Sequence, residues 1–116
     1  ELMNTAQCLE IIRSELEISF SDFVELIDNE YWFSNIAFEN GNLLNSINEN
    51  QGSAKVFCFG RMHSLSKQET LKCFGEHYTS VLESPEDTKS HLNIRSFIEN
   101  SWKGLLIDYD ALTIKK

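Results

Sequence analysis

Residues 52–78 read GSAKVFCFGRMHSLSKQETLKCFGEHY, and this stretch decides the fold. It contains the densest apolar run of the chain, two of the three cysteines and two of the three histidines. Val56-Phe57-Cys58-Phe59 alone would suit a buried strand. Over the longer window, however, the apolar positions cover nearly the whole circumference of a helix, as a fully buried helix requires. We therefore predict a central helix over 53–65, capped by Ser53.

A second helix is predicted directly after the first. Ser66 is followed three residues later by Glu69, which is the capping-box pattern of a helix start. Apolar side chains keep helical spacing behind this cap, at Leu71, Phe74, Tyr78, Val81 and Leu82. The second helix should therefore extend over 67–82. Gly60 and Gly75 fall inside the two predicted helices, where glycine costs about 1 kcal/mol relative to alanine, so we expect both at close backbone contacts.

The N-terminal part of the chain predicts two more helices. Residues 5–17 place apolar side chains at helical spacing after a cap at Asn4 or Thr5. A break follows, and Ser21 is then positioned to cap another helix. The apolar stripe of that helix consists of Phe23, Leu26, Ile27 and Tyr31.

Tyr31, Trp32 and Phe33 form an aromatic cluster at the end of this predicted helix. Each ring can bury a large apolar area, so packing in the core or at its rim is one interpretation. The alternative is an exposed patch that binds a partner protein or stacks on a ligand.

Turn signals predict a hairpin beside the helices. Asn40-Gly41 is the strongest short turn signal, because both residues tolerate positive φ. It should join strands within 36–44, and residues 45–52 then form a loop.

The C-terminal part adds a helix and further strand-like sequence. A helix resumes near Ser90 and ends at 101–104, and 105–114 forms either a terminal strand or a second hairpin. Residues 1–116 are therefore predicted to form a single α+β domain. It is helix-rich, with four to five helices and a small antiparallel β-sheet built from 36–44 and 105–114.

Composition and charge narrow the class of protein. The formal net charge is −8, and it is uneven: residues 1–50 carry ten acids and one base (−9), whereas residues 51–116 carry eight acids and nine bases (+1). Such a surface repels nucleic-acid phosphates and anionic lipids, so we expect no nucleic-acid partner. No apolar run approaches the ~18 residues of a membrane span, so no membrane insertion is expected. The acidic half is either a solvated face or a docking surface for a basic partner.

The cysteines give no sign of a metal or redox site. Cys8, Cys58 and Cys73 lie among apolar neighbours and match no zinc or redox spacing. We expect buried free thiols in a reducing cytosol, and neither a metal nor a cofactor. Glu1 and Leu2 precede Met3 and are expected to be a cloning remnant.

A series of short motifs covers most of the chain. The motifs are Phe38-Glu39-Asn40-Gly41, Asn50-Gln51-Gly52-Ser53-Ala54-Lys55-Val56-Phe57, Leu65-Ser66, Thr70-Leu71-Lys72-Cys73-Phe74-Gly75, Asn93-Ile94-Arg95-Ser96-Phe97, Trp102-Lys103-Gly104 and Ala111-Leu112. With these motifs the chain resembles the HopJ family of type III effectors, and residues 18–33 match more loosely. The resemblance implies a protein of the bacterial cytoplasm. It implies secretion into a host cell only through the family name, and it implies no biochemical activity.

Three places depart from the pattern expected of that family. Glu76 to Ser80 replaces a basic and aromatic segment, Ser90-His91-Leu92 stands where Asp-His is expected, and Ser101 replaces a glycine. A role that depends on arginine or aspartate at those places does not transfer to this protein.

Cys73 and His77 are the first candidate pair for chemistry. They are four residues apart in the predicted helix 67–82, so their side chains would share one face. A thiolate beside an imidazole is how cysteine hydrolases activate their nucleophile. The alternative is a buried structural cysteine below a surface histidine. Adding His63 and His91 to this pair gives no known zinc spacing.

His91, Asn93 and Arg95 are the best polar candidates for a ligand site. Arg95 is four residues from His91 near a helix start, and a guanidinium can bind a carboxylate or phosphate through two hydrogen bonds. The alternative is a buried polar network that ties loop 84–90 to the acidic N-terminal half, with Arg95 paired to one of its acids.

Two functions compete on this sequence. The first is a non-enzymatic, effector-like interaction module that binds an unknown protein partner through an acidic and aromatic surface at Tyr31, Trp32 and Phe33. The second is a small-molecule-binding protein or an enzyme. Its site would combine His91, Asn93 and Arg95, with Cys73 and His77 as further members. A cleft on which those residues converge would favour the second function, and a flat acidic face beside exposed Trp32 and Phe33 the first.

Overall fold

Helices predominate in the computed structural model, which describes residues 2–116. The expectation for Glu1 therefore lies outside the described residues. In chain order the elements are α1 (Thr5–Ile12), α2 (Phe20–Glu30), β1 (Tyr31–Phe33), β2 (Phe38–Asn40), β3 (Leu43–Asn45), α3 (Gln51–Met62), α4 (Lys67–Lys72), α5 (Glu76–Glu83), α6 (Leu92–Asn100), η1 (Ser101–Gly104), β4 (Leu105–Leu106), η2 (Tyr109–Ala111) and β5 (Leu112–Ile114). The predicted helix-rich α+β fold is confirmed.

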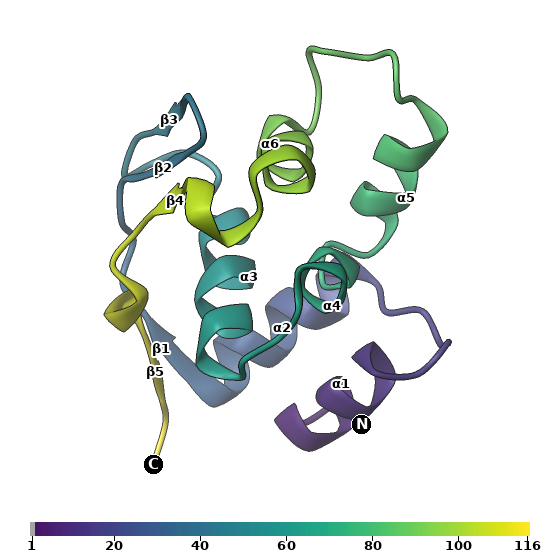
Figure 1. Cartoon of the computed structure of the whole chain (residues 1–116). Coiled ribbons are helices and arrows are strands. Elements are labelled where there is room, and N and C mark those ends of the chain that lie inside the picture. Colours follow the sequence, from purple (N-terminus) through teal and green to yellow (C-terminus); the bar gives the residue numbers. More distant parts are fainter. Residues whose placement is uncertain (1) are drawn as a thin grey trace.

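Helix α3 lies in the middle of the molecule, between the strands and the other helices (Figure 1). Its buried residues cover most of its circumference and are Ala54, Val56, Phe57, Cys58, Phe59 and Gly60. The Phe57 ring contacts the rings of Phe38, Phe74 and Phe97, at centroid distances of 6.2, 5.7 and 5.0 Å. These rings come from strand β2, the turn between α4 and α5, and helix α6, so α3 is the element around which the core is built. The buried central helix is confirmed.

The start of α3 differs from the prediction. The helix begins at Gln51 rather than Ser53, and Asn50 precedes it in the left-handed conformation, with φ 53°. The Gln51 side chain exchanges two hydrogen bonds with the backbone of Ile36, donating to its carbonyl at 2.9 Å and accepting from its N–H at 2.8 Å. This contact fastens the helix to the segment before β2, so the loop predicted over 45–52 is shorter.

The single helix predicted over 67–82 is wrong, because the chain breaks at Gly75 into α4 and α5. Gly75 has φ +58°, and a Cβ there would lie 2.6 Å from both the Ile18 carbonyl oxygen and the Phe20 nitrogen. Only glycine adopts such a conformation readily. The close backbone contact expected at Gly75 is present. The capping box of Ser66 and Glu69 at the start of α4 is confirmed.

Gly60 allows close packing of side chains rather than of backbones. A Cβ at Gly60 would lie 2.8 Å from Thr70 Oγ1 and 3.0 Å from the Trp102 ring. The expected backbone contact is therefore wrong at this position, although the space is equally small.

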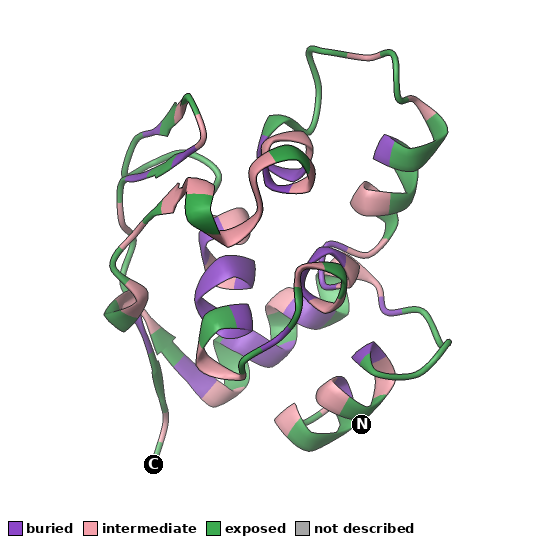
Figure 2. Ribbon diagram, viewed as in Figure 1, coloured by how far each residue is buried: buried purple, intermediate pink, exposed green. Residues whose placement is uncertain are grey.

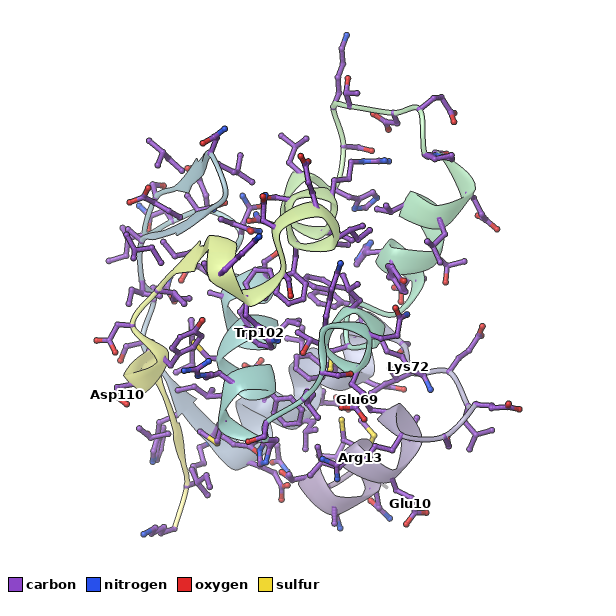
Figure 3. All side chains as sticks on the ribbon, in the orientation of Figure 1. Glu10, Arg13, Glu69, Lys72, Trp102 and Asp110 are labelled. Carbon is purple, nitrogen blue, oxygen red and sulfur yellow. The ribbon has the colours of Figure 1, made fainter. Side chains whose placement is uncertain are left out.

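Helix α1 is shorter than predicted, because it ends at Ile12 rather than at residue 17. The ammonium group of Lys72 donates to the carbonyls of Ile11 at 3.1 Å, Ile12 at 3.3 Å and Ser14. Carbonyls at a helix C-terminus lack partners within the helix and carry partial negative charge. Lys72 therefore closes α1 and joins it to α4, and Figure 3 shows it in the same region as Arg13.

Helix α2 also begins differently, since Ser19 rather than Ser21 accepts the capping hydrogen bond, from the Asp22 N–H. The helix carries the predicted stripe, with Phe23, Leu26 and Ile27 buried. Tyr31 follows as the first residue of strand β1.

The strands form two small antiparallel sheets, one of order β3-β2-β4 and one of β1 with β5. The hairpin between β2 and β3 is confirmed, but its two-residue loop is Gly41-Asn42, because Asn40 pairs with Leu43. Of these two loop residues only Gly41 has positive φ, as in a type II′ turn. Strands β4 and β5 join different sheets because η2 separates them, so the C-terminal segment is not a hairpin.

Burial is uneven across the molecule. Helix α3 is buried over most of its length and α2, α4 and α6 each bury one side, whereas α5 and the loop after it are mainly exposed (Figure 2). Val81 is the one buried residue of α5. Among the described residues, no helix is long and apolar enough to cross a membrane.

Candidate functional site

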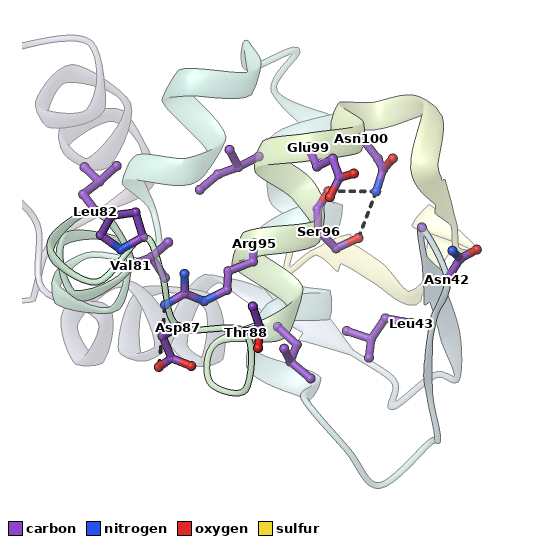
Figure 4. A pocket seen from close by; sticks show the side chains of 14 residues that line it. Asn42, Leu43, Val81, Leu82, Asp87, Thr88, Arg95, Ser96, Glu99 and Asn100 are labelled. Atoms are coloured by element: carbon purple, nitrogen blue, oxygen red, sulfur yellow. Dashed lines mark hydrogen bonds and ion pairs between the residues drawn. The ribbon is translucent and has the colours of Figure 1, made fainter.

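A cleft of about 820 Å³ lies where α5, the following loop, α6 and the β2–β3 turn meet. Its apolar lining residues are Leu43, Val81, Leu82, Pro85, Leu92 and Ile98, and its polar ones include Asp87, Thr88, Arg95, Ser96, Glu99 and Asn100. We call this hollow the α5–α6 cleft (Figure 4). Leu82 and Leu92 remain 58% and 42% exposed, so two large apolar side chains lie open to solvent at its edges.

Arg95 is the cationic side chain of the α5–α6 cleft. Its side chain is 16% exposed, and Nε donates to the Ser90 carbonyl at 2.8 Å. Nη2 lies 3.8 Å from Asp87 Oδ2, beyond hydrogen-bond distance. This nitrogen is buried and has no hydrogen-bond partner within the described residues. Arg95 therefore lines the cleft with a guanidinium that the described residues leave incompletely hydrogen-bonded.

Asp87 organises the loop beside Arg95. Its carboxylate accepts hydrogen bonds from the Lys89 N–H at 2.7 Å, the Ser90 N–H at 3.2 Å and the Ser90 hydroxyl. These bonds, with that of the Ser90 side chain foremost, lower the pKa of Asp87 to about 2, and Arg95 adds to the effect. The predicted partner of Arg95 in the acidic N-terminal half is wrong, because Arg95 pairs within its own loop.

A second hollow, of about 470 Å³, adjoins the first and shares Leu43 and Leu92 with it. His77 and His91 line this second hollow, with ring centroids 5.3 Å apart. The His77 ring also packs edge-on against Phe20 at 5.0 Å. His91 therefore lies in a different hollow from Arg95, although the two are four residues apart. The reason is that His91 precedes α6 in a left-handed conformation, with φ 51°.

Asn93 belongs mainly to a buried polar network. Its side-chain oxygen accepts from Asn40 Nδ2 at 3.1 Å and Asn45 Nδ2 at 3.2 Å, and its Nδ2 donates to Asn45 Oδ1 at 2.9 Å. These amides tie α6 to both strands of the hairpin. Asn93 also lines the second hollow. The structure therefore distributes the three predicted residues over two hollows and a network, rather than converging them on one cleft.

Cys73 and His77 do not share a helix face, because Gly75 separates α4 from α5. Cys73 is fully buried, and its thiol lies 3.6 Å from the Glu69 carbonyl oxygen. Burial raises the pKa of Cys73 well above its ordinary value. The thiol therefore stays protonated, unlike a hydrolase nucleophile, and Cys73 lines neither hollow.

The aromatic cluster is divided by the alternation of strand β1. Tyr31 is buried, with its hydroxyl 2.8 Å from His63 Nε2 and 3.0 Å from Thr5 Oγ1. Phe33 is half-buried, whereas Trp32 is 63% exposed. The Lys115 ammonium lies over the Trp32 ring, 4.4 Å from its centroid. One exposed ring, not three, therefore remains of the predicted patch.

The sequence interpretation missed the cleft as a whole. The helical spacing assigns Leu82 to an apolar helix stripe, and Asp87 falls within the predicted loop 84–90. Only the break at Gly75, which redirects α5, leaves Leu82 exposed beside α6. Two features of the sequence could have indicated the cleft. Gly75 can adopt a positive φ and so can end a helix. The spacing of Asp87 and Ser90 in the loop favours local hydrogen bonds between side chain and backbone.

Comparison with known proteins agrees with this fold. The family model described as HopJ type III effector protein matches residues 5–112, so the chain belongs to the HopJ type III effector family. More particularly, it is similar to the crystal structure of VPA0580, a protein of unknown function. The TM-score is 0.92 at 40% sequence identity, covering 99% of this chain and 97% of that chain. A search of curated proteins finds no match.

Proposed function

We propose that this HopJ-family protein is a non-enzymatic protein-interaction module that binds a segment of a partner protein in the α5–α6 cleft. The observation that carries the proposal is the pair of exposed leucines, Leu82 and Leu92, at the edges of an open cleft with a central arginine. Interfaces typically combine an apolar centre with a few polar groups that orient the partner. We place its action in the bacterial cytoplasm, with delivery to a host cell suggested by the family name.

This proposal moves the partner surface predicted at Tyr31, Trp32 and Phe33. Tyr31 is buried, so it cannot contact a partner without unfolding. Trp32 is exposed and can still contact a partner, although it does not line the cleft. The Phe33 ring is partly covered by Lys55, whose Nζ lies 5.5 Å from the Phe33 ring centroid. We retain Trp32 as a secondary contact.

The cleft can be tested with an uncharged peptide. We expect the blocked tetrapeptide Ac-Ala-Leu-Gln-Ala-NH2 to bind the isotope-labelled protein with a dissociation constant of about 1 mM or weaker, as suits one buried leucine. Amide chemical-shift changes should centre on α5 and α6. Leu82→Ser should weaken the binding, and Leu106→Ser, at a similarly exposed position on the sheet, should not. Shifts centred on β1 and β5 would instead place the interaction at Trp32.

A small-molecule site in the second hollow is the competing function. The observation in its favour is that His77, Lys89 and His91 line this hollow without any carboxylate, although the chain carries a net charge of −8. Titration with inorganic phosphate tests it. Shifts of both histidine ring signals that His91→Gln abolishes would favour this function, and unchanged ring signals would count against it.

A further inference from the structure

We infer that the α5–α6 cleft selects a partner segment in which one acidic side chain lies next to an apolar one, and that Arg95 recognises the acid. This inference rests on the proposed function, because it names the chemistry of the segment that the cleft would bind. It starts from the guanidinium, which has more hydrogen-bond donors than the fold uses. Nε is committed to the Ser90 carbonyl at 2.8 Å, whereas buried Nη2 has no partner.

The fold provides a hydrogen-bond acceptor for Nε alone, and the Arg95 side chain lines the cleft with 16% of its surface exposed. Unpaired donors cost free energy, and an acceptor supplied by a ligand at the exposed part of the guanidinium would offset that cost. A carboxylate is the best match, because it can accept two parallel N–H bonds from a guanidinium and compensates its charge. Partial burial strengthens this pair, since water screens it less than at an open surface.

Asp87 orients Arg95 without occupying its free donor. The Asp87 carboxylate already accepts three hydrogen bonds from Lys89 and Ser90, and it lies 3.8 Å from Nη2. It therefore attracts the guanidinium toward the loop and holds it in the cleft, as Figure 4 shows.

The dimensions of the cleft fix the length of the segment. The cleft follows α6 from Leu92 to Asn100, which corresponds to about 12 Å at the helical rise per residue. An extended chain of about four residues has this length. Leu82 and Leu92 provide apolar contacts beside Arg95. Glu99 lies one helical turn beyond Arg95 and also lines the cleft, so a second acid in the segment would meet a like charge.

A matched pair of peptides tests the inference. Ac-Ala-Leu-Glu-Ala-NH2 and Ac-Ala-Leu-Gln-Ala-NH2 have the same shape and differ in one charge. We expect the Glu peptide to bind wild-type protein about 10-fold more tightly, as a charge-assisted hydrogen bond in a partly buried site predicts. The measurement is the NMR titration of amide signals at low salt, and added salt should reduce the difference.

Variants of the protein assign the preference to Arg95. Arg95→Gln should remove the difference between the two peptides. Arg95→Lys should retain only part of the difference, because an ammonium lacks the two-pronged geometry. Lys103→Gln is the matched control: it removes the same charge from an exposed position outside the cleft and should keep the preference.

A further variant distinguishes the effect of the loop structure from the effect of the Arg95 side chain itself. Ser90→Ala removes the hydroxyl bond to Asp87 but keeps the carbonyl that accepts from Arg95, so it should preserve the preference. If both peptides bind wild type equally, the inference is overturned and the proposed function stands. If neither peptide binds, both are overturned.

Discussion

Helices α3 and α5 show how differently one small fold can use two of its helices. Neither begins with a side-chain cap, yet α3 has six buried residues over twelve positions and α5 has Val81 alone over eight. Helix α3 contacts aromatic rings from several elements, whereas α5 packs through Val81 and the half-buried His77 and Tyr78 and leaves Leu82 exposed. The comparison indicates that burial is concentrated around α3, which leaves α5 for the binding surface that we propose. Four predictions test this contrast.

The largest expected effect separates the two helices directly. Phe57→Ala should destabilise the protein by about 3–5 kcal/mol, because it opens a cavity among three other rings. Leu82→Ala should change stability by about 0.5 kcal/mol or less, as is usual for an exposed position. Chemical denaturation of both variants measures the difference. Equal losses would mean that α5 is as much a part of the core as α3.

Gly75→Ala should cause the next largest loss of stability, because Gly75 lies at the start of α5 and contacts the backbone of residues 18–20. The new Cβ would meet backbone atoms of Ile18 and Phe20 at 2.6 Å in a conformation that alanine rarely adopts. We expect a loss of about 2–4 kcal/mol. Gly60→Ala provides the comparison at α3, where side chains of Thr70 and Trp102 can move slightly, so its loss should be smaller. The reverse order would show that the break between α4 and α5 is not fixed by this contact.

The wall of the cleft opposite α5 is expected to be rigid. Asn93→Ala removes three buried side-chain hydrogen bonds. Asn40 then keeps its bond to the backbone carbonyl of residue 93, and Asn45 keeps its bonds to Phe38 and Asn50. We expect a loss of about 1–3 kcal/mol, with faster hydrogen exchange in the β2–β3 hairpin. Ser96→Ala, which removes the hydroxyl bond to the Asn40 carbonyl, should cost less. An unchanged hairpin in Asn93→Ala would mean that the network does not hold it.

The smallest expected effect is a pH dependence at the end of α3. Burial, and secondarily the charge of Arg13, lowers the pKa of His63 below its ordinary value. The unfolded chain, with a histidine pKa of about 6.5, therefore binds this proton at a higher pH than the folded chain. Between the two values the unfolded state holds more protons, so the stability contributed by neutral His63 is complete above 6.5 and falls as the pH is lowered.

Denaturation at pH 5.5 and 7.5 measures this effect, with His63→Gln as the reference variant. The wild type should lose slightly more stability than the variant between the two pH values. An equal loss would show that the contact between His63 and Tyr31 is insensitive to protonation.

The sequence was most informative where the local signal and the core agreed. The Ser66–Glu69 capping box and the aromatic run of α3 were predicted correctly, because a cap needs only neighbouring residues and a continuous apolar run has to be buried. The hairpin was predicted one residue away from its actual loop, since its register depends on pairing across strands. The helical spacing of Phe74 and Leu82 predicts one continuous helix. Spacing alone does not reveal the break at Gly75, because that break depends on contacts with residues 18–20.

The candidate site was predictable only in part. Arg95 and His91 were identified from their chemistry, but His91 lies in the second hollow because its left-handed backbone turns it away from α6. Asn93 was identified as polar and near a helix start, yet its partners Asn40 and Asn45 are about fifty residues away in the chain. Cys73 and His77 form a candidate pair only if one helix contains both residues, and in the structure the helix is interrupted between them.

By itself the sequence determined the helix-rich α+β class, the buried central helix, the capped start of α4 and membership of the HopJ family. These follow from patterns that are read within a few residues or matched along the chain. The tertiary structure alone decided that Gly75 divides two helices, that Tyr31 is buried while Trp32 is exposed, and that Arg95 lines a cleft. Each of these depends on contacts between segments distant in the chain, such as Ile18 with Gly75, which local propensity does not encode.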